Sequence, residues 1–182
     1  MCILFLFYTF LQTCFVFNSY EENVNYELVR TLRFQTTLDW AKTSASQDKK
    51  RGIEIINLQR TAVESDLGKK YIATQSCKIE KLPPTNIKNY SLSALSIFQK
   101  KKGFKIIKTI THTDGLLQLT YAIGYWAYYV DDAHVLHKLI IVHGIHKNGN
   151  GVQFFIDCPD TIFLQLEEEI TAEIRTLSFL YP

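Results

Sequence analysis

The sequence predicts an α+β fold, in which an antiparallel sheet of about five to seven strands packs against a central helix and a C-terminal amphipathic helix. Three observations predict this class. The chain has 182 residues, 47% of them hydrophobic, which suits one packed domain. The second half contains short runs rich in β-branched and aromatic residues, separated by turn residues. Two other segments repeat apolar residues every three or four positions, as helices do.

The chain begins with an uncharged apolar segment. No charge precedes Glu21, and polar side chains interrupt residues 2–17 only at Thr9, Gln12 and Thr13. A helix of this length rises about 24 Å, which is short for a hydrocarbon core of about 30 Å. The sequence therefore predicts a signal peptide or short membrane anchor over residues 1–19, followed by a single globular α+β domain over residues 20–182. The alternative is a buried first strand or helix of the domain.

The four residues Leu11-Gln12-Thr13-Cys14 resemble the lipobox of bacterial lipoproteins, in which the Cys becomes the lipidated first residue after cleavage. The lipobox has Gly, Ala or Ser before the Cys, and this chain departs from it at Thr13. Cys14 is thus a candidate lipidation site, and burial of an unmodified Cys14 in the membrane is the alternative. A lipid would tether the domain without spanning the bilayer.

Two cysteines, Cys77 and Cys158, lie outside the leader. A disulfide between them would agree with export to an oxidising compartment. Two unpaired buried thiols are the alternative, because free Cys behaves as a small hydrophobic residue. Neither belongs to a CxxC pair, so the spacing gives no support to a redox motif.

The first half of the domain predicts strands followed by the central helix. Residues 28–38 alternate apolar and polar side chains, which predicts a strand. Residues 42–51 are polar without periodicity and predict a solvated loop, whereas residues 53–58 and, more weakly, 71–79 predict further strands. Pro83-Pro84 ends the last of these.

The central helix is expected directly after the two prolines. Thr85 or Asn86 can cap its N-terminus, and Gly103 follows a lysine triplet that suits its C-terminal end. One face of this helix is apolar at Ile87, Tyr90, Ala94, Ile97 and Phe98.

The rest of the chain predicts a meander of four antiparallel strands and a final helix. Thr113-Asp114-Gly115 suits a tight hairpin, and Asn148-Gly149 suits another turn. The strands are expected at residues 104–112, 116–129, 135–146 and 151–158. In the final helix four apolar residues step by four, with glutamates on the other side: Ile162, Leu166, Ile170 and Ile174 against Glu167, Glu168, Glu169 and Glu173.

The C-terminal region carries a family resemblance. A strand over residues 152–159, ending in Cys158-Pro159, runs into the acidic helix, which ends in Ile174-Arg175-Thr176-Leu177-Ser178-Phe179. Together with the order of the preceding elements, this resembles the PsbP/DcrB-like superfamily. The order of helices and strands is similar over residues 28–179, whereas the amino-acid sequence itself is similar only near the C-terminus. The resemblance implies a compact domain used for binding and assembly, often lumenal or periplasmic and often a lipoprotein. Some relatives are cytoplasmic chaperones for secreted effectors. No functional motif of the family matches this sequence, so the resemblance assigns no site residue.

Four of the five histidines lie between His134 and His146 and invite a test for metal binding. His137 and His143 would share a strand face but lie about 20 Å apart, whereas His143 and His146 would point to opposite faces. We therefore expect no metal site, and no cofactor or catalytic residue is assigned. A small enzyme that uses the strand from His134 to His146 is the least favoured reading.

The densest aromatic cluster supplies the candidate binding surface. Trp126 and Tyr128, with Tyr125 beside them, alternate across a predicted strand, so some of these rings should be exposed. Packing in the core and at the sheet edge is the alternative for them. A net charge of +2 and the lack of a glycine-rich phosphate loop argue against nucleic acid and nucleotides as partners.

These observations predict a non-enzymatic binding domain of the cell envelope. The expected protein is exported, periplasmic or membrane-anchored through its N-terminus, as a lipoprotein if Cys14 is modified, and binds a protein or an envelope component. The alternative is a cytoplasmic chaperone or interaction module with the same fold.

Overall fold

The structure is a computed structural model, which describes residues 23–28 and 31–180. The predicted leader and the candidate lipidation site Cys14 lie outside these residues. The described elements are β1 (Asn23–Leu28), β2 (Leu32–Thr37), β3 (Trp40–Asp48), β4 (Ile53–Arg60), β5 (Val63–Glu64), β6 (Lys70–Tyr71), β7 (Thr74–Lys81), α1 (Ile87–Leu95), η1 (Phe98–Lys100), β8 (Lys105–Ile110), η2 (His112–Asp114), β9 (Ala122–Val130), β10 (Leu136–Ile145), β11 (Asn150–Pro159), α2 (Asp160–Thr176) and β12 (Ser178–Phe179).

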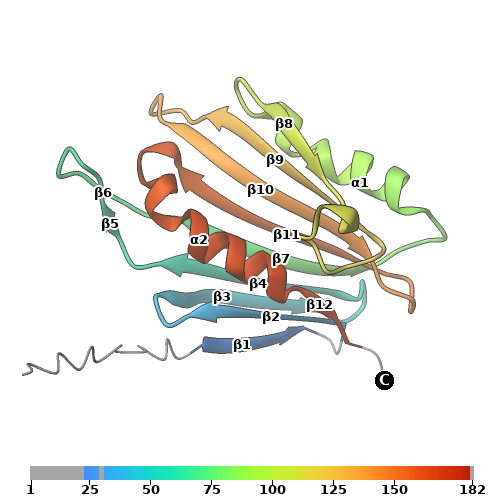
Figure 1. Ribbon diagram of the computed structural model, residues 1–182. Coiled ribbons are helices and arrows are strands. Elements are labelled where there is room, and N and C mark those ends of the chain that lie inside the picture. The colour runs from blue at the N-terminus through green and yellow to red at the C-terminus, as the bar shows by residue number, and fades with distance from the viewer. Residues whose placement is uncertain (1–22, 29–30, 181–182) are drawn as a thin grey trace, which may run out of the picture.

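A seven-stranded antiparallel sheet forms the centre of the fold (Figure 1). Its strand order is β3-β4-β7-β11-β10-β9-β8, so the strands from β8 to β11 are successive neighbours and form the predicted meander. A three-stranded sheet has the order β1-β2-β12, and β5 pairs with β6. The predicted α+β class, with one central and one C-terminal helix, is confirmed.

The two helices cover opposite faces of the large sheet. Trp126 in β9 packs its ring against Phe163 of α2, with ring centroids 5.5 Å apart. The preceding residue, Tyr125, is hydrogen-bonded at 2.7 Å to Ser91 of α1. Because successive strand residues point to opposite faces, α1 and α2 lie on different sides of the sheet. Figure 1 shows α2 in front of the central strands and α1 beside β8 and β9.

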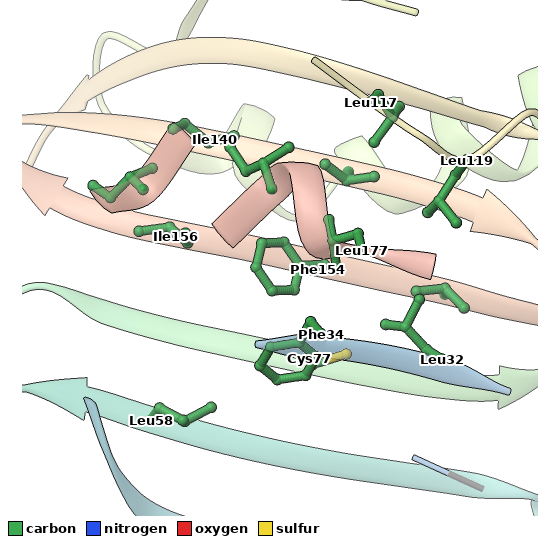
Figure 2. Close-up of a cluster of buried hydrophobic side chains, with 14 of the residues drawn as sticks. Leu32, Phe34, Leu58, Cys77, Leu117, Leu119, Ile140, Phe154, Ile156 and Leu177 are labelled. Atoms are coloured by element: carbon green, nitrogen blue, oxygen red, sulfur yellow. The ribbon is translucent and has the colours of Figure 1, made fainter. Parts of the chain in front are cut away.

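The larger core lies between the sheet and α2. The apolar stripe of α2 is fully buried in it, as predicted, and β2 contributes Phe34, whose ring meets Phe154 of β11 edge to face at 5.5 Å. Figure 2 shows Phe34 of β2, Cys77 of β7 and Phe154 of β11 in this core together with Leu177, which directly follows α2. A smaller core under α1 contains Leu95, Phe98, Tyr125, Ala127, Tyr129, Leu139 and Ile141.

Three predicted strand and loop features differ from the structure. Residues 28–38 do not form one strand, since β1 ends at Leu28, β2 starts at Leu32, and Leu38 lies 62% exposed in a turn. The predicted loop over residues 42–51 is mostly strand β3, an edge strand whose residues after Trp40 are all exposed. A strand with solvent on both faces has no reason to alternate apolar and polar residues. The tight hairpin is η2, and a longer connection leads from it to β9.

The predicted start of α1 and the turn before β11 are confirmed, but the predicted end of the helix is wrong, because α1 ends at Leu95, before the lysine triplet and Gly103, and Ile97 is 60% exposed. Asn86 caps α1, because its side-chain oxygen accepts a hydrogen bond from the Asn89 backbone N–H at 2.9 Å. Gly149 turns the chain between β10 and β11 with φ of 84°, a conformation that glycine adopts without strain. Across residues 23–28 and 31–180, no helix is both long and apolar enough to cross a membrane.

Candidate functional site

The predicted aromatic cluster lies in β9 and divides between the two faces of the sheet. Tyr125 faces α1, is 8% exposed and bonds to Ser91. Its inclusion in a binding surface is therefore wrong, because its ring belongs to the core under α1. Trp126 and Tyr128 face the other side and are half-buried.

Three lysines flank these two half-buried rings. In the antiparallel register, Lys105 of β8 and Lys138 of β10 are the partners of Tyr128, and Lys108 of β8 is the partner of Trp126. Directly paired residues project from the same face of a sheet. The five residues, Lys105, Lys108, Trp126, Tyr128 and Lys138, are called the lysine–aromatic face.

The lysine–aromatic face is open to solvent at the β8 edge of the sheet. Helix α2 packs chiefly on β2, β10 and β11, so it leaves β8 and β9 less covered. Lys105 and Lys108 are exposed, and among the described residues neither forms an ion pair. Lys138 forms an ion pair with Asp160 at 3.3 Å, and its ammonium lies 4.2 Å from the centroid of the Phe163 ring. The face thus combines aromatic surface with a net positive charge.

A second cluster surrounds His137 on the α1 side. The Nδ1 of His137 donates to Asp157 at 2.6 Å, and Tyr129 donates its hydroxyl to the same carboxylate at 2.7 Å. The Nε2 of His137 lies 3.4 Å from Asp131. Burial lowers the pKa of His137, but the hydrogen bond and charge of Asp157 and the charge of Asp131 outweigh it, so the pKa is raised.

The His137 cluster has the arrangement of a structural network. Its two carboxylates meet opposite ring nitrogens, which point away from each other, so they cannot converge on one ion with the imidazole. Lys101 completes the cluster, with its ammonium 3.7 Å from the Tyr129 ring centroid and 3.9 Å from Asp157. Within the described part of the chain, no group of three or more His, Cys, Asp or Glu residues could hold a metal ion.

The structure also brings Ser91 and His143 together, which the sequence could not show because they lie on α1 and β10. Their side chains are hydrogen-bonded at 2.9 Å, and both residues are 0% exposed. Burial lowers the pKa of His143 to about 4, so the imidazole is neutral at physiological pH. Without access for a substrate, this pair fastens α1 to the sheet together with Tyr125.

The two cysteines are free and buried, so the predicted disulfide is wrong and the alternative of two thiols is observed. Cys77 pairs in register with Phe154, and Cys158 lies four residues further along β11. Four residues span about 13 Å of strand, whereas bridged Cα atoms lie within about 7 Å. Burial raises the pKa of both thiols, that of Cys158 to about 12, so neither is a reactive thiolate.

Comparison with known proteins finds similarity in structure and none in sequence. No family profile and no curated protein sequence matches the chain. LpqN of Mycobacterium tuberculosis, involved in cell envelope biogenesis, superposes with a TM-score of 0.57 at 11% identity, covering 88% of this chain and 91% of LpqN. The Ran-binding protein Mog1p of Saccharomyces cerevisiae gives 0.55 at 9% identity, covering 88% and 96%. The cyanobacterial PsbP of Synechocystis gives 0.52 at 10% identity, covering 87% and 93%.

These neighbours share the PsbP-like fold, so the resemblance to the PsbP/DcrB-like superfamily is confirmed at the level of the fold. Identities this low establish the architecture and nothing finer. The fold is used both by a protein of cell envelope biogenesis and by a Ran-binding protein. Function therefore has to be argued from this chain's own surface.

Proposed function

We propose that this protein is a non-enzymatic binding domain that holds an acidic segment of a protein partner on its lysine–aromatic face. The observation that carries the proposal is the shared face of Trp126 and Tyr128 with Lys105, Lys108 and Lys138. Aromatic rings supply contact area at low entropic cost, and lysines at the rim select a partner of opposite charge.

The location of β8 supports the same reading. This strand is the edge of the large sheet, and Ile107, which lies in the bulge between Ile106 and Lys108, is 58% exposed. Apolar and cationic groups side by side at an open edge suit an acidic segment that also carries apolar residues. Nucleic acid fits less well, because the whole chain carries a net charge of only +2.

Selection from a random peptide library on the immobilised full-length protein tests the proposed binding surface. Enriched peptides should combine Asp or Glu with aromatic residues, and their affinity, measured by isothermal titration calorimetry, should fall as salt rises. The double variant Lys105→Glu/Lys108→Glu should weaken binding at least about tenfold, which corresponds to about 1.4 kcal/mol. Lys42→Glu, an exposed charge reversal on the opposite edge strand β3, should leave it unchanged.

Two results would contradict the proposal: no enrichment of acidic sequences, or equal binding of the selected peptides by the wild type and the charge-reversed double variant. Trp126→Ala provides an independent check, and circular dichroism would establish that this variant is folded. A folded Trp126→Ala protein with wild-type affinity also argues against the face.

We further propose that the domain acts outside the cytoplasm, delivered by its apolar N-terminus and tethered by a lipid if Cys14 is modified. The support is the uncharged apolar sequence before Glu21, together with the use of the same fold by an envelope protein. Cell fractionation with mass measurement of the mature N-terminus tests this. A cytoplasmic protein that retains Met1 would favour the alternative, an intracellular chaperone or interaction module.

A further inference from the structure

Both sheets share one end of the domain, which is also the end where the chain enters it. The first residue of β1, Asn23, pairs in register with Thr37 at the end of β2. Two residues later β3 starts at Trp40, opposite Arg60 at the end of β4. The registers of β7, β11, β10 and β9 continue this end across the large sheet. The β2–β3 turn, the β5–β6 hairpin, the β9–β10 loop and the start of α2 therefore lie there (Figure 1).

This end carries the most exposed apolar side chains of the described chain. Among residues 23–28 and 31–180, Leu67 at 84% exposure and Leu164 at 79% exceed every other large apolar residue. Three more apolar side chains at this end are also exposed. The five residues, Leu38, Leu67, Ile72, Leu136 and Leu164, are called the apolar end. Single exposed apolar residues are ordinary on a protein surface, whereas a group of them marks an interaction site.

The two most exposed residues of the apolar end lie on neighbouring elements. Leu67 is at the tip of the β5–β6 hairpin, where the Gly68 N–H donates to the carbonyl three residues earlier at 2.8 Å and closes the turn. The side-chain amide of Gln165 in α2 donates to the Glu64 carbonyl of the same hairpin at 3.3 Å. The hairpin therefore lies beside the first turns of α2, where Leu164 is exposed.

The charges around the tip of the hairpin have mixed signs. Glu64 and Asp66 precede Leu67, and Lys69 and Lys70 follow it. All four charged side chains are exposed, and their charges cancel. Attraction to a partner at this end therefore has to come from apolar contact, which a neutral lipid bilayer offers as well as an anionic one.

The sequence before Asn23 indicates which apolar phase lies close to this end. The predicted signal peptide or anchor ends at residue 19, four residues before Asn23, and four residues span at most about 14 Å. A retained anchor therefore keeps the apolar end next to the membrane surface. A lipid on Cys14, nine residues before Asn23, keeps it within about 32 Å. So short a tether makes even a weak contact effective, because the local concentration of the bilayer is high.

We propose that the apolar end docks on the surface of a lipid bilayer, with Leu67 and Leu164 in contact with lipid. The inference rests on the membrane tether proposed above and adds to it the orientation of the domain. The strands then run away from the membrane, and the turn at Gly149 between β10 and β11 points away from it. A protein partner is the alternative occupant, and it is less favoured because the tether already brings the bilayer to this end.

Tryptophan fluorescence of the full-length protein in phosphatidylcholine vesicles tests the docking, after flotation has established that the protein is tethered. Leu67→Trp adds a tryptophan whose emission, measured against the wild type, should shift to shorter wavelength and be quenched by brominated phosphatidylcholine. Leu92→Trp on α1 is the matched control and should show neither effect. The residue before it, Ser91, bonds to His143, which lies seven residues along β10 from Leu136, about 23 Å from this end.

A charge on the apolar end provides an independent measurement. In the Leu67→Trp background, Leu164→Asp should lower the ratio of docked to undocked protein at least about tenfold, which corresponds to about 1.4 kcal/mol, and quenching should fall with it. Leu92→Asp in the same background should leave quenching unchanged, and circular dichroism would establish that both variants are folded. Because the charges at this end cancel, added phosphatidylglycerol or higher salt should change quenching little.

The outcomes separate docking from tethering. If the protein floats with the vesicles but Leu67→Trp is quenched no more than Leu92→Trp, the tether stands, docking is refuted and a protein partner becomes the occupant to seek. Unchanged quenching in Leu164→Asp also refutes docking, and a strong dependence on anionic lipid overturns its apolar mechanism. Full-length protein that does not float contradicts both the tether and the docking, whereas the lysine–aromatic face is tested separately by peptide selection.

Discussion

Acidification is expected to destabilise the fold through His143, whose imidazole is buried between Tyr90 and Tyr125 under α1. The ring centroid of His143 lies 5.9 Å from that of Tyr90 and 6.1 Å from that of Tyr125, and the Nε2 atom has no hydrogen-bond partner. A proton on this ring would place a charge in the smaller core. Burial therefore lowers the pKa of His143 to about 4 in the folded protein.

The magnitude follows from proton linkage. In the unfolded chain the imidazole titrates near about 6.5, and each unit of difference is worth about 1.36 kcal/mol. As pH falls from about 7.5 to about 5, the unfolded chain gains a proton that the folded protein does not, so the free energy of unfolding should fall by about 2 kcal/mol from this residue. The loss begins near the unfolded pKa and is complete below the folded one.

Urea denaturation of the wild type and His143→Gln across this pH range measures the effect. Gln cannot take up a proton, so the stability difference between the two proteins should change with pH by about 2 kcal/mol in the variant's favour at the acidic end. The variant's constant loss of ring packing cancels in that comparison. His134→Asn, which removes an exposed imidazole at a left-handed position, is the control and should retain the wild-type slope. Parallel stability curves for wild type and His143→Gln would refute the reasoning.

Three other substitutions probe the packing and charge of the fold. Gly151→Ala would place a Cβ atom 2.6 Å from the Tyr90 ring, so it should lower the free energy of unfolding by about 1–3 kcal/mol in urea titrations. Glu173→Gln should raise the melting temperature near neutral pH. The pKa of Glu173 is higher in the folded protein than in the unfolded chain, so the wild type loses stability as pH rises above the unfolded pKa, whereas the variant does not. The gain should vanish below about pH 4. Arg60→Met should cost about 3 kcal/mol by stranding the Glu169 carboxylate, and a double-mutant cycle with Glu169→Leu should recover part of it.

The elements that the sequence predicts well are those whose burial follows one simple period. Helix α2 is an example, since its apolar residues step by four and face a single core. Strands β10 and β11 are also predicted, because turn residues separate them and their side chains suit a sheet. In both cases the local pattern and the tertiary surroundings agree.

The candidate site depended on information that no local pattern holds. Tyr125 is buried and Trp126 is half-exposed because different helices cover the two faces of β9. The alternation of the sequence alone does not show which of the two rings is buried. The lysines of the binding face come from β8 and β10, so their grouping appears only with the strand register. The burial of Glu173 could have been predicted, because it lies three residues after Ile170 and therefore at the edge of the apolar stripe.

The two inward-facing acids of α2 show how its partners decide the charge of a buried carboxyl group. Glu169 is held by Arg60, Trp40 and Thr37, so it joins α2 to β2, β3 and β4, and its charge is compensated where it stands. Glu173, one turn later and more deeply buried, has no cationic partner, and the neighbouring hydrogen-bonding group is the Gln75 amide. If this position only closed the helix on the sheet, a leucine would serve better, because it would avoid about 1–3 kcal/mol of unpaired polar burial. Burial raises the pKa of Glu173, so the folded protein favours the neutral carboxyl, and Glu173→Gln, which cannot ionise, should lose less stability than the wild type as pH rises above the unfolded pKa.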